Sequence, residues 1–472
     1  LQSVGETVPK SRPEYGKLVF MSRKFKTADY EATLNQTISI REALPADHLA
    51  RFVVDLVAQL DLGRLYERFA PYGGVAYAPE ILLALLFYGY ATGVFSSRKI
   101  EKATYESVPF RFVAGGMHPD HDTLANFRKT FRVEIKDLFV QVLLVAQAAG
   151  YLTLGNISLD GSKIHANASK SHAVSYKRLL ELEVQLRTEV EDLFRLAELA
   201  DKQALPEGLV VDDEIAFRQQ RLVRLAEAKT ILEARAQVRY EAEQAEYEAK
   251  LHQREEKTRR SGRKPGGKPP KAPTPGPQDK DQYNFTDPES RIMKCSTSDG
   301  FDQAYNAQVA VDQDTLLIVA HALSNHTNDK NEAVPTLDAL PPELGTPTAV
   351  AMDNGYFSES NIAACEARSI EPYIATGREP HHQSWQEYFD QEPEPPPDDA
   401  SPSVKMAYKL RTAIGHAIYR LRKCTVEPVI GIIKAVLGFR QFSLRGLDPA
   451  DCEWSLVCLA FNLKRLHTLS LG

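Results

Sequence analysis

The stretch SLDGSKIHANASK, residues 158–170, places an acid, Asp160, at the end of a short extended run and follows it directly with Gly161. A second extended run, TAVAMD at residues 348–353, also ends on an acid, Asp353, and is followed by the pair NG. Ligand sites in α/β sheets favour the carboxyl ends of strands, so the two carboxylates converge if the strands are neighbours. A lone acid at a strand end is more often a turn or cap former, and two such acids alone are weak evidence for a site.

A third acid, Glu427, lies in the segment TVEPVIGIIK, residues 425–434. Thr425 is a capping residue and Pro428 falls where a first helical turn tolerates proline, so we expect a helix to begin here. Glu427 then lies among apolar neighbours, and Lys434 follows two turns later on roughly the same face. A carboxylate on the packed side of a helix is costly unless it is paired or binds a metal.

Three carboxylates, two from strand ends and one from a helix, are the groups that metal-dependent phosphoryl transfer requires. Oxygen ligands alone favour Mg²⁺ or Mn²⁺. The five cysteines form no CxxC pair, which argues against a zinc site and against a disulfide framework.

Composition places the chain among ordinary globular proteins, with 472 residues, 43% hydrophobic and 25% charged. Its net charge of −6 alone argues against nucleic acid, but residues 254–271 hold eight bases against two acids, and residues 405–423 hold six bases and no acid. Such segments can bind phosphate because electrostatic potentials act locally. No apolar stretch approaches the about 20 residues of a membrane span, and no secretory signal pattern opens the chain. We therefore expect no membrane association and a cytoplasmic location.

The N-terminal third predicts helices. Residues 1–44 are polar and are expected to be a loosely ordered start, and apolar residues at helical spacing predict an all-helical domain over 45–150. We expect this domain to bind DNA because one of its helices offers a basic face. One helix, near residues 121–131, would expose Arg128 and Lys129 on a face able to read a DNA groove. For any single helix, however, a polar face is more often simply exposed to solvent than in contact with DNA.

The remainder predicts an α/β domain with an insertion. Residues 151–175 and 281–472 alternate strands with helices, which predicts an α/β domain. Because this domain contains all three acids, it is the expected catalytic domain. Residues 176–260 keep an apolar stripe in a highly charged background, which predicts a helical hairpin, and residues 261–280 form a basic Pro/Gly linker. The other elements expected in the α/β domain are strands at 304–312, 316–323 and 371–375, helices at 359–368 and 403–423, and a C-terminal helix at 449–466.

Several segments together resemble bacterial insertion-sequence transposases of the DDE type, of the 1182-type family. The resemblance spans residues 45–468, and its motifs are specific only as a set. The segments that carry it are EILLALL (80–86), DHDTLANFR (120–128), LDGSKIHANAS (159–169), YNAQVAVD (305–312), DNGYFS (353–358), TVEPVIGIIK (425–434) and the closing RGL, EW and AFNLKRL between 445 and 466.

The resemblance implies a ribonuclease H-like fold, a mixed sheet with flanking helices, in which Asp160, Asp353 and Glu427 form a catalytic triad that binds Mg²⁺ or Mn²⁺. It implies DNA as the partner, as terminal inverted repeats and as target, and a homodimer in the synaptic complex. It also implies action in the bacterial cytoplasm, at the nucleoid. The residues expected to contact DNA are Lys434, Lys423, Arg422, Arg420, Arg128 and Lys129.

Around the third acid the family pattern of tyrosine, arginine, glutamate and lysine is only partly kept. Lys434 falls at the position of the family lysine, but Lys423 replaces the arginine and Arg420 stands where the tyrosine would be. Lysine keeps the charge and loses the bidentate fork of arginine.

Two other functions stay open at this point. A metal-dependent nuclease or resolvase of the same fold would cleave DNA without joining it. A non-catalytic DNA-binding protein from a decayed element would do neither, although the presence of all three acids weighs against it.

Overall fold

The computed structural model describes residues 39–69, 76–200, 210–262, 266–295, 300–377 and 394–472. The chain divides into two compact units, Leu1–Pro45 and Ala46–Gly472. The described part of the first unit contains one short helix, α2 (Ile40–Ala43). All other elements belong to the second unit.

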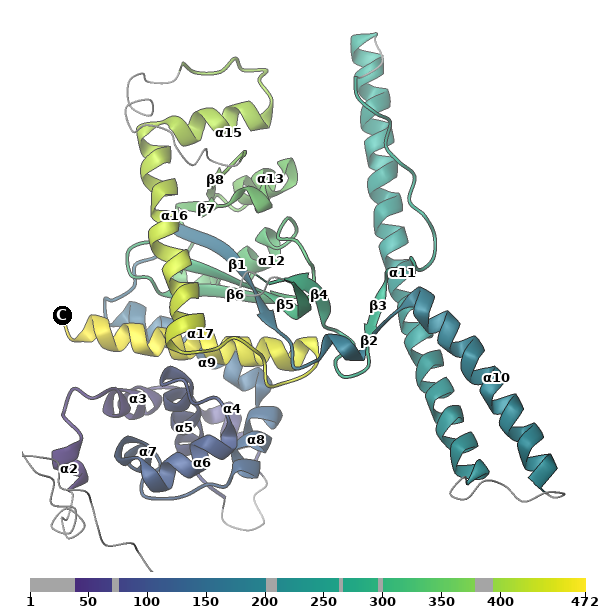
Figure 1. Ribbon diagram of the computed structural model, residues 1–472. Helices are drawn as coiled ribbons and strands as arrows, with labels where there is room; N and C mark the ends of the chain where they lie inside the picture. The colour runs from purple at the N-terminus through teal and green to yellow at the C-terminus, as the bar shows by residue number, and fades with distance from the viewer. Residues whose placement is uncertain (1–38, 70–75, 201–209, 263–265, 296–299, 378–393) are drawn as a thin grey trace, which may run out of the picture. The chain divides into compact units, whose positions relative to one another are not determined.

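A six-stranded mixed sheet lies at the centre of the second unit (Figure 1). Its strand order is β4-β5-β1-β7-β8, with β6 paired to β5 beside β4. β1 is antiparallel to β5 and parallel to β7, and β7 is parallel to β8. The strands are β1 (Ile157–His165), β4 (Arg291–Lys294), β5 (Phe301–Asp312), β6 (Ile318–Ser324), β7 (Ala349–Met352) and β8 (Glu371–Ile374). This arrangement confirms the predicted α/β, ribonuclease H-like class.

β1 continues well beyond Asp160. The expectation that this strand ends on the acid is wrong. β5 has twelve residues and pairs with every residue of β1, from Ile157 opposite Asp312 to His165 opposite Ala304. The pairing with β7, in contrast, covers only Ile157 to Leu159. Asp160 therefore lies where β1 loses its parallel neighbour, and not where β1 itself ends.

The helix that carries the third acid is longer than expected. α15 (Pro402–Arg411) is followed, after Thr412, by α16 (Ala413–Gly431), which contains Pro428 in its interior. The predicted helix start at Thr425 is therefore wrong. The break falls instead at Thr412, whose hydroxyl accepts a hydrogen bond from the Gly415 backbone N–H and caps α16.

α16 packs along the sheet, against β1, β5, β7 and β8 (Figure 1). Thr425 fixes it there, since its hydroxyl oxygen lies 2.8 Å from that of Ser158 on β1 and both residues are buried. The Gln313 amide donates to the same Ser158 hydroxyl at 2.9 Å. The α16 turn that contains Glu427 is thus held against the part of β1 next to Asp160.

The helices over residues 46–150 share a core with the catalytic sheet. The long helix α17 (Leu447–Ser470) is buried on almost every side and packs against β6, α5 and α9. A helix that is apolar all round belongs in a core. The helices that precede β1 are α3 (Leu49–Val57), α4 (Gly63–Glu67), α5 (Pro79–Ala91), α6 (Ser97–Glu106), α7 (Val108–Val113), α8 (His121–Thr130) and α9 (Arg132–Ala148).

A helical hairpin occupies the predicted insertion between β1 and β5. α10 (Tyr176–Ala200) packs against α11 (Val211–Ser261) around a small core that includes Leu179, Leu225 and Leu232. α11 ends at Gly262, whose φ of 65° suits the left-handed C-terminal cap that glycine adopts without strain.

Short elements connect the hairpin and the sheet. β2 (Ala173–Ser175) and β3 (Gln282–Asn284) form a separate antiparallel pair at the base of the hairpin, and neither was predicted. α12 (Ala333–Asp338) and α13 (Glu359–Ala367) pack beside β6 and β8.

Among the described residues, no helix combines the length and apolar character needed to cross a bilayer.

Candidate active site

Asp160 and Asp353 occupy equivalent positions on adjacent parallel strands. Leu159 of β1 pairs with Met352 of β7, and each acid is the next residue along its chain. Each carboxylate accepts a nearby backbone N–H: Asp160 Oδ1 from Gly161 at 2.8 Å, and Asp353 Oδ1 from Gly355 at 2.7 Å. The two side chains that the sequence predicts to converge therefore lie at the same edge of the sheet.

Glu427 is connected to Asp160 through an arginine. The guanidinium of Arg422 donates from Nη1 to Asp160 Oδ2 at 2.9 Å and from Nη2 to Glu427 Oε1 at 3.0 Å. The Arg422 side chain is 9% exposed and the Asp160 side chain 18%, whereas the Glu427 side chain is 48% exposed. The third acid therefore reaches the site from its open side.

The environment of Asp160 disfavours its charged form. Burial raises the pKa of Asp160 to about 6, and the nearby negative charges of Asp353 and Asp329 push in the same direction. The Arg422 guanidinium and the Gly161 N–H oppose this rise. The pKa of Asp160 is therefore raised mainly because its carboxyl group is buried, and a buried acid with a raised pKa beside other acids is a candidate functional group.

The three acids as arranged do not form a ready metal site. Within the described ranges, no group of three His, Cys, Asp or Glu side chains is placed to hold a metal ion. The oxygen donors suit Mg²⁺ or Mn²⁺, but Arg422 takes up one oxygen of Asp160 and one of Glu427. A divalent cation shared by Asp160 and Glu427 would compete with Arg422 for these two oxygens.

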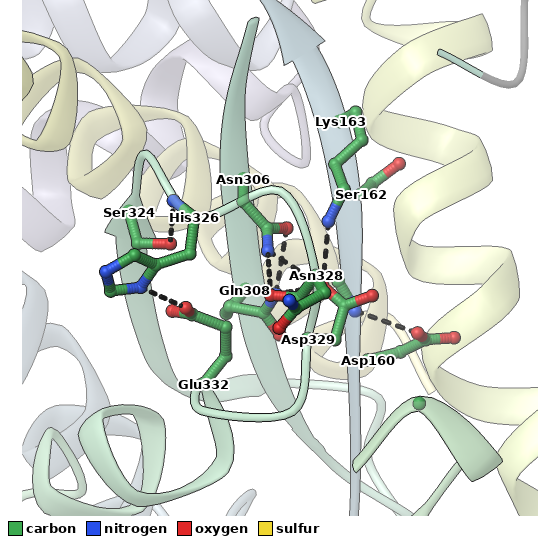
Figure 2. Close-up of polar contacts among 12 residues, drawn as sticks. Asp160, Ser162, Lys163, Asn306, Gln308, Ser324, His326, Asn328, Asp329 and Glu332 are labelled. Carbon is green, nitrogen blue, oxygen red and sulfur yellow. Dashed lines mark hydrogen bonds and ion pairs between the residues drawn. The ribbon is translucent and has the colours of Figure 1, made fainter. Parts of the chain in front are cut away.

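A fourth acid, Asp329, lies at the centre of a polar network (Figure 2). Its Oδ1 accepts from Lys163 Nζ at 2.8 Å, from Asn306 Nδ2 at 2.8 Å and from Gln308 Nε2 at 3.1 Å. The hydroxyl of Tyr356 donates to Gln308 Oε1. The network connects β1 and β5 to the segment after β6 and to the turn after β7, and so positions the strands that carry the acids.

Asp329 was missed by sequence reasoning. It lies in the polar loop SNHTNDKNE, residues 324–332, where no strand end or helix start distinguishes one acid from its neighbours. A usable signal is the alternation on β5, which places the amides Asn306 and Gln308 on one face of the strand, among small and apolar neighbours from Ala304 to Val311. Both amides are fully buried, and buried amides need partners.

Gly161 allows the network to pack against β1. It pairs with Gln308 across the β1–β5 ladder, and a Cβ added to Gly161 would lie 2.2 Å from Gln308 Nε2. Only glycine leaves room for this amide. The glycine after the first acid therefore has a packing role that the sequence alone did not reveal.

Lys434 lies beside β1, in the π-helical turn η4 (Ile432–Val436) that extends α16. Its ammonium donates to the Ser162 hydroxyl and to the Lys163 carbonyl, the latter at 3.1 Å. Burial lowers the pKa of Lys434, with the charges of Arg440 and Lys163 adding to this effect. The amine is thus held two residues beyond Asp160 along β1.

The other predicted DNA contacts divide between exposed and buried side chains. Arg420 and Lys423 on α16 and Lys129 on α8 are exposed. Arg422 is buried, as described above. Arg128 was expected to be exposed, and this is wrong: its guanidinium donates to the Tyr90 hydroxyl at 2.5 Å and lies 3.8 Å from the buried Glu453.

Two family models match parts of the chain. Residues 273–463 match a family described as the transposase DDE domain, and residues 38–130 match a family described as a transposase domain (DUF772). No curated protein and no solved structure matches the chain. The fold, the acids at its edge and these matches define an enzyme of the DNA-cutting and DNA-joining kind.

The chain belongs to the insertion-sequence transposases of the DDE type. The matches do not separate the 1182-type family from its relatives, so that finer assignment stays a prediction.

Proposed function

We propose that this transposase binds the terminal inverted repeats of its element, cleaves at their ends and joins them to target DNA by phosphoryl transfer, with Mg²⁺ or Mn²⁺ as its cofactor. The observation that carries the proposal is the placement of Asp160 and Asp353 at matching positions on adjacent strands, with Glu427 connected to Asp160 through Arg422. These three acids are the proposed catalytic and metal-binding residues.

Cations beside the acids supply the proposed phosphate contacts. Lys434 lies along β1 past Asp160, and Arg420 and Lys423 are exposed on α16 within two turns of Glu427. Lysine and arginine next to a carboxylate site orient a DNA strand through its phosphates without reading its sequence. Lys129, exposed near the end of α8, is the proposed contact in the N-terminal helices.

The proposal includes two copies of the chain, because two element ends must be brought together before they are joined. We place this homodimer on DNA, in the cytoplasm at the nucleoid. Light scattering of the protein mixed with end DNA measures its stoichiometry, and two chains per pair of ends is the expected result.

Asp353→Asn tests the proposal, because it removes one carboxylate charge and keeps the side-chain size. We expect loss of metal-dependent cleavage of end DNA, with binding of that DNA unchanged in a gel-shift assay. The matched control is Asp192→Asn, an exposed position on α10 with 64% of its side chain accessible, which should cleave as the unmodified protein does. Unaltered cleavage by Asp353→Asn would remove this acid from the mechanism.

A strand-transfer assay on pre-cleaved ends with a free 3′-hydroxyl separates the remaining possibilities. Joining to target DNA supports the transposase. Cleavage without joining would identify a nuclease or resolvase of the same fold. DNA binding with neither reaction would identify a non-catalytic protein from a decayed element.

A further inference from the structure

We infer that Arg422 is a resident counter-ion of the acidic site, which holds Asp160 and Glu427 in place of a divalent cation and gives up both carboxylates when that cation binds. The inference rests on the proposed function, since it takes these acids as the metal-binding residues. It assigns to Arg422 a positioning role that the exposed basic residues of α16 do not have.

The position of the Arg422 guanidinium is the first observation that supports the counter-ion role. Arg422 spans two acids from different elements, one on β1 and one on α16 itself, with both hydrogen bonds near 3 Å. Its side chain is nine-tenths buried. A cation between two carboxylates offsets the repulsion that the carboxylates would otherwise exert on each other. Arg422 therefore occupies the position that a shared cation needs.

The second observation is that the hydrogen bonding of Arg422 is incomplete, which favours its displacement by a divalent cation. Its Nε–H is buried and has no partner. A buried donor without an acceptor costs free energy, so the guanidinium is held by its two carboxylates and not by a fully satisfied pocket. The one positive charge of Arg422 also faces the charges of Asp160, Glu427 and Asp353. A divalent cation supplies twice that charge and competes for the same oxygens.

An aromatic side chain of the same helix lies next to the Arg422 guanidinium. The Arg422 guanidinium carbon lies 5.8 Å from the centre of the Tyr419 ring, within the range of a cation–π contact. Tyr419 and the exposed Arg420 and Lys423 lie on the same helix within one turn. Once released, Arg422 joins these cations and becomes available to a DNA phosphate, which is the contact predicted for it from the sequence.

Mn²⁺ binding in the absence of DNA tests the inference without using activity. Titration of the full chain, followed by calorimetry or by the electron paramagnetic resonance of free Mn²⁺, compares the unmodified protein with Arg422→Gln. We expect Arg422→Gln to bind Mn²⁺ about tenfold more tightly, the change that follows if Arg422 leaves the site free only about one-tenth of the time. Arg411→Gln, at an exposed position on α15, is the matched control and should bind as the unmodified protein does.

The outcomes separate failure of this inference from failure of the proposed function. Equal or weaker Mn²⁺ binding by Arg422→Gln, with the binding still lost in Asp160→Asn, would overturn the counter-ion role and leave the metal site intact. Mn²⁺ binding that Asp160→Asn does not alter would show that the metal does not use these acids, and the proposed function would then lose its site.

A measurement on the unmodified chain avoids any folding defect of the variant. An arginine-specific dicarbonyl reagent modifies accessible guanidinium groups, and mass spectrometry of peptides reports the extent at each arginine. We expect Mn²⁺ to increase modification of Arg422 several-fold and to leave that of Arg411 unchanged. Equal modification of Arg422 with and without Mn²⁺, at concentrations where Mn²⁺ binds, would overturn the inference.

Discussion

At the scale of single residues, the acids of this chain differ in what surrounds them. Glu453 on α17 is completely buried, yet both of its oxygens have partners: the backbone N–H groups of Ser443 and Leu444 donate at 2.9 and 3.0 Å, and the Tyr90 hydroxyl donates at 3.1 Å. Arg128 lies 3.8 Å away and supplies the opposite charge. Glu453 is therefore a structural acid, whereas Asp160 and Glu427 share a single cation.

Glu453→Ala should strongly destabilise the fold, because it leaves the buried Arg128 charge without its counter-charge and the Ser443 and Leu444 backbone N–H groups without their acceptor. We expect the free energy of unfolding to fall by about 3–5 kcal/mol, as for other broken buried ion pairs. Urea denaturation measures it, with Glu343→Ala, an exposed position, as the control. A loss below about 1 kcal/mol would contradict this account.

Gly161→Ala should damage the site through Gln308. The added methyl group would occupy the space of the Gln308 amide, which bonds to Asp329 and Tyr356. We expect a loss of about 1–3 kcal/mol in the free energy of unfolding, together with reduced cleavage. Gly155→Ala is the control, because its nearest neighbour would lie at an ordinary 3.6 Å. Unchanged stability in both variants would argue against the packing role of Gly161.

At the scale of elements, β6 contains a histidine that the fold keeps neutral. Burial lowers the pKa of His321 to about 4, the Lys136 charge adds to this and the Asp451 charge opposes it. The ring packs edge-on against Phe139 of α9, with the centroids 4.6 Å apart. The Nδ1 atom is buried and has no hydrogen-bond partner. Protonation would therefore place a charge between the sheet and α9.

The free energy of unfolding should fall at acidic pH because His321 resists protonation in the folded chain. The unfolded chain, in which histidine has a pKa of about 6.5, binds the proton more readily than the folded chain. The free energy of unfolding is therefore unaffected by His321 above pH 6.5 and decreases as the pH falls from 6.5 toward 4, by about 3 kcal/mol in total. Denaturant titrations across this range should show the decrease in the unmodified protein and a smaller one in His321→Leu. The same pH slope in both proteins would contradict the assignment.

Local sequence patterns were sufficient to predict β5, from its alternation, and β7, β8 and α13, from the succession of strand and helix patterns, each within a few residues. The extent of β1 could not be predicted in this way. The residues after Asp160 are polar, and they stay extended only because β5 supplies a partner for each of them. Pro428 likewise favours a helix start, but packing of α16 against the sheet overrides that preference.

In the candidate site, too, some features could be predicted from local sequence and others depend on residues far away along the chain. Asp160 and Asp353 lie next to each other as the two similar runs predicted, although β1 continues past Asp160 and the helix that carries Glu427 begins earlier than expected. The bridging position of Arg422 could not be predicted, because α16 was expected to be interrupted before Glu427, and only a continuous helix fixes the five-residue offset between Arg422 and Glu427. Burial of Arg128 was equally invisible, since its partner Glu453 lies 325 positions away along the chain.

At the scale of the whole second unit, α17 connects the N-terminal helices to the catalytic sheet. It contacts α5 and α9 on one side and β6 on the other, so neither group of elements has a complete core without it. Leu456, Leu459 and Leu463 on this helix are completely buried. Residues 46–472 should therefore unfold together in their core, whichever part binds DNA.

A chain that begins at residue 151 should fail to fold, because removing the N-terminal helices exposes the apolar face of α17 that they cover. We expect aggregation on size-exclusion chromatography and loss of the cooperative thermal transition in circular dichroism. The full chain carried through the same purification is the control. A monomeric, cooperatively folding 151–472 fragment would show that the sheet and α17 form an independent domain.

The π-helical turn after α16 has a consequence for how this protein can change over evolution. The chain around this turn is attached to β1 at several points: Arg422 donates to Asp160, Thr425 bonds to Ser158, Lys434 donates to Ser162 and Lys163, and His165 exchanges backbone hydrogen bonds with Arg440 and Phe442. The wide turn lies between the first and the last of these attachments, so its length sets their register along β1. Loss of one residue there would rotate all that follows by about 100°, so insertions and deletions should be absent from this interval among functional relatives and frequent in the hairpin.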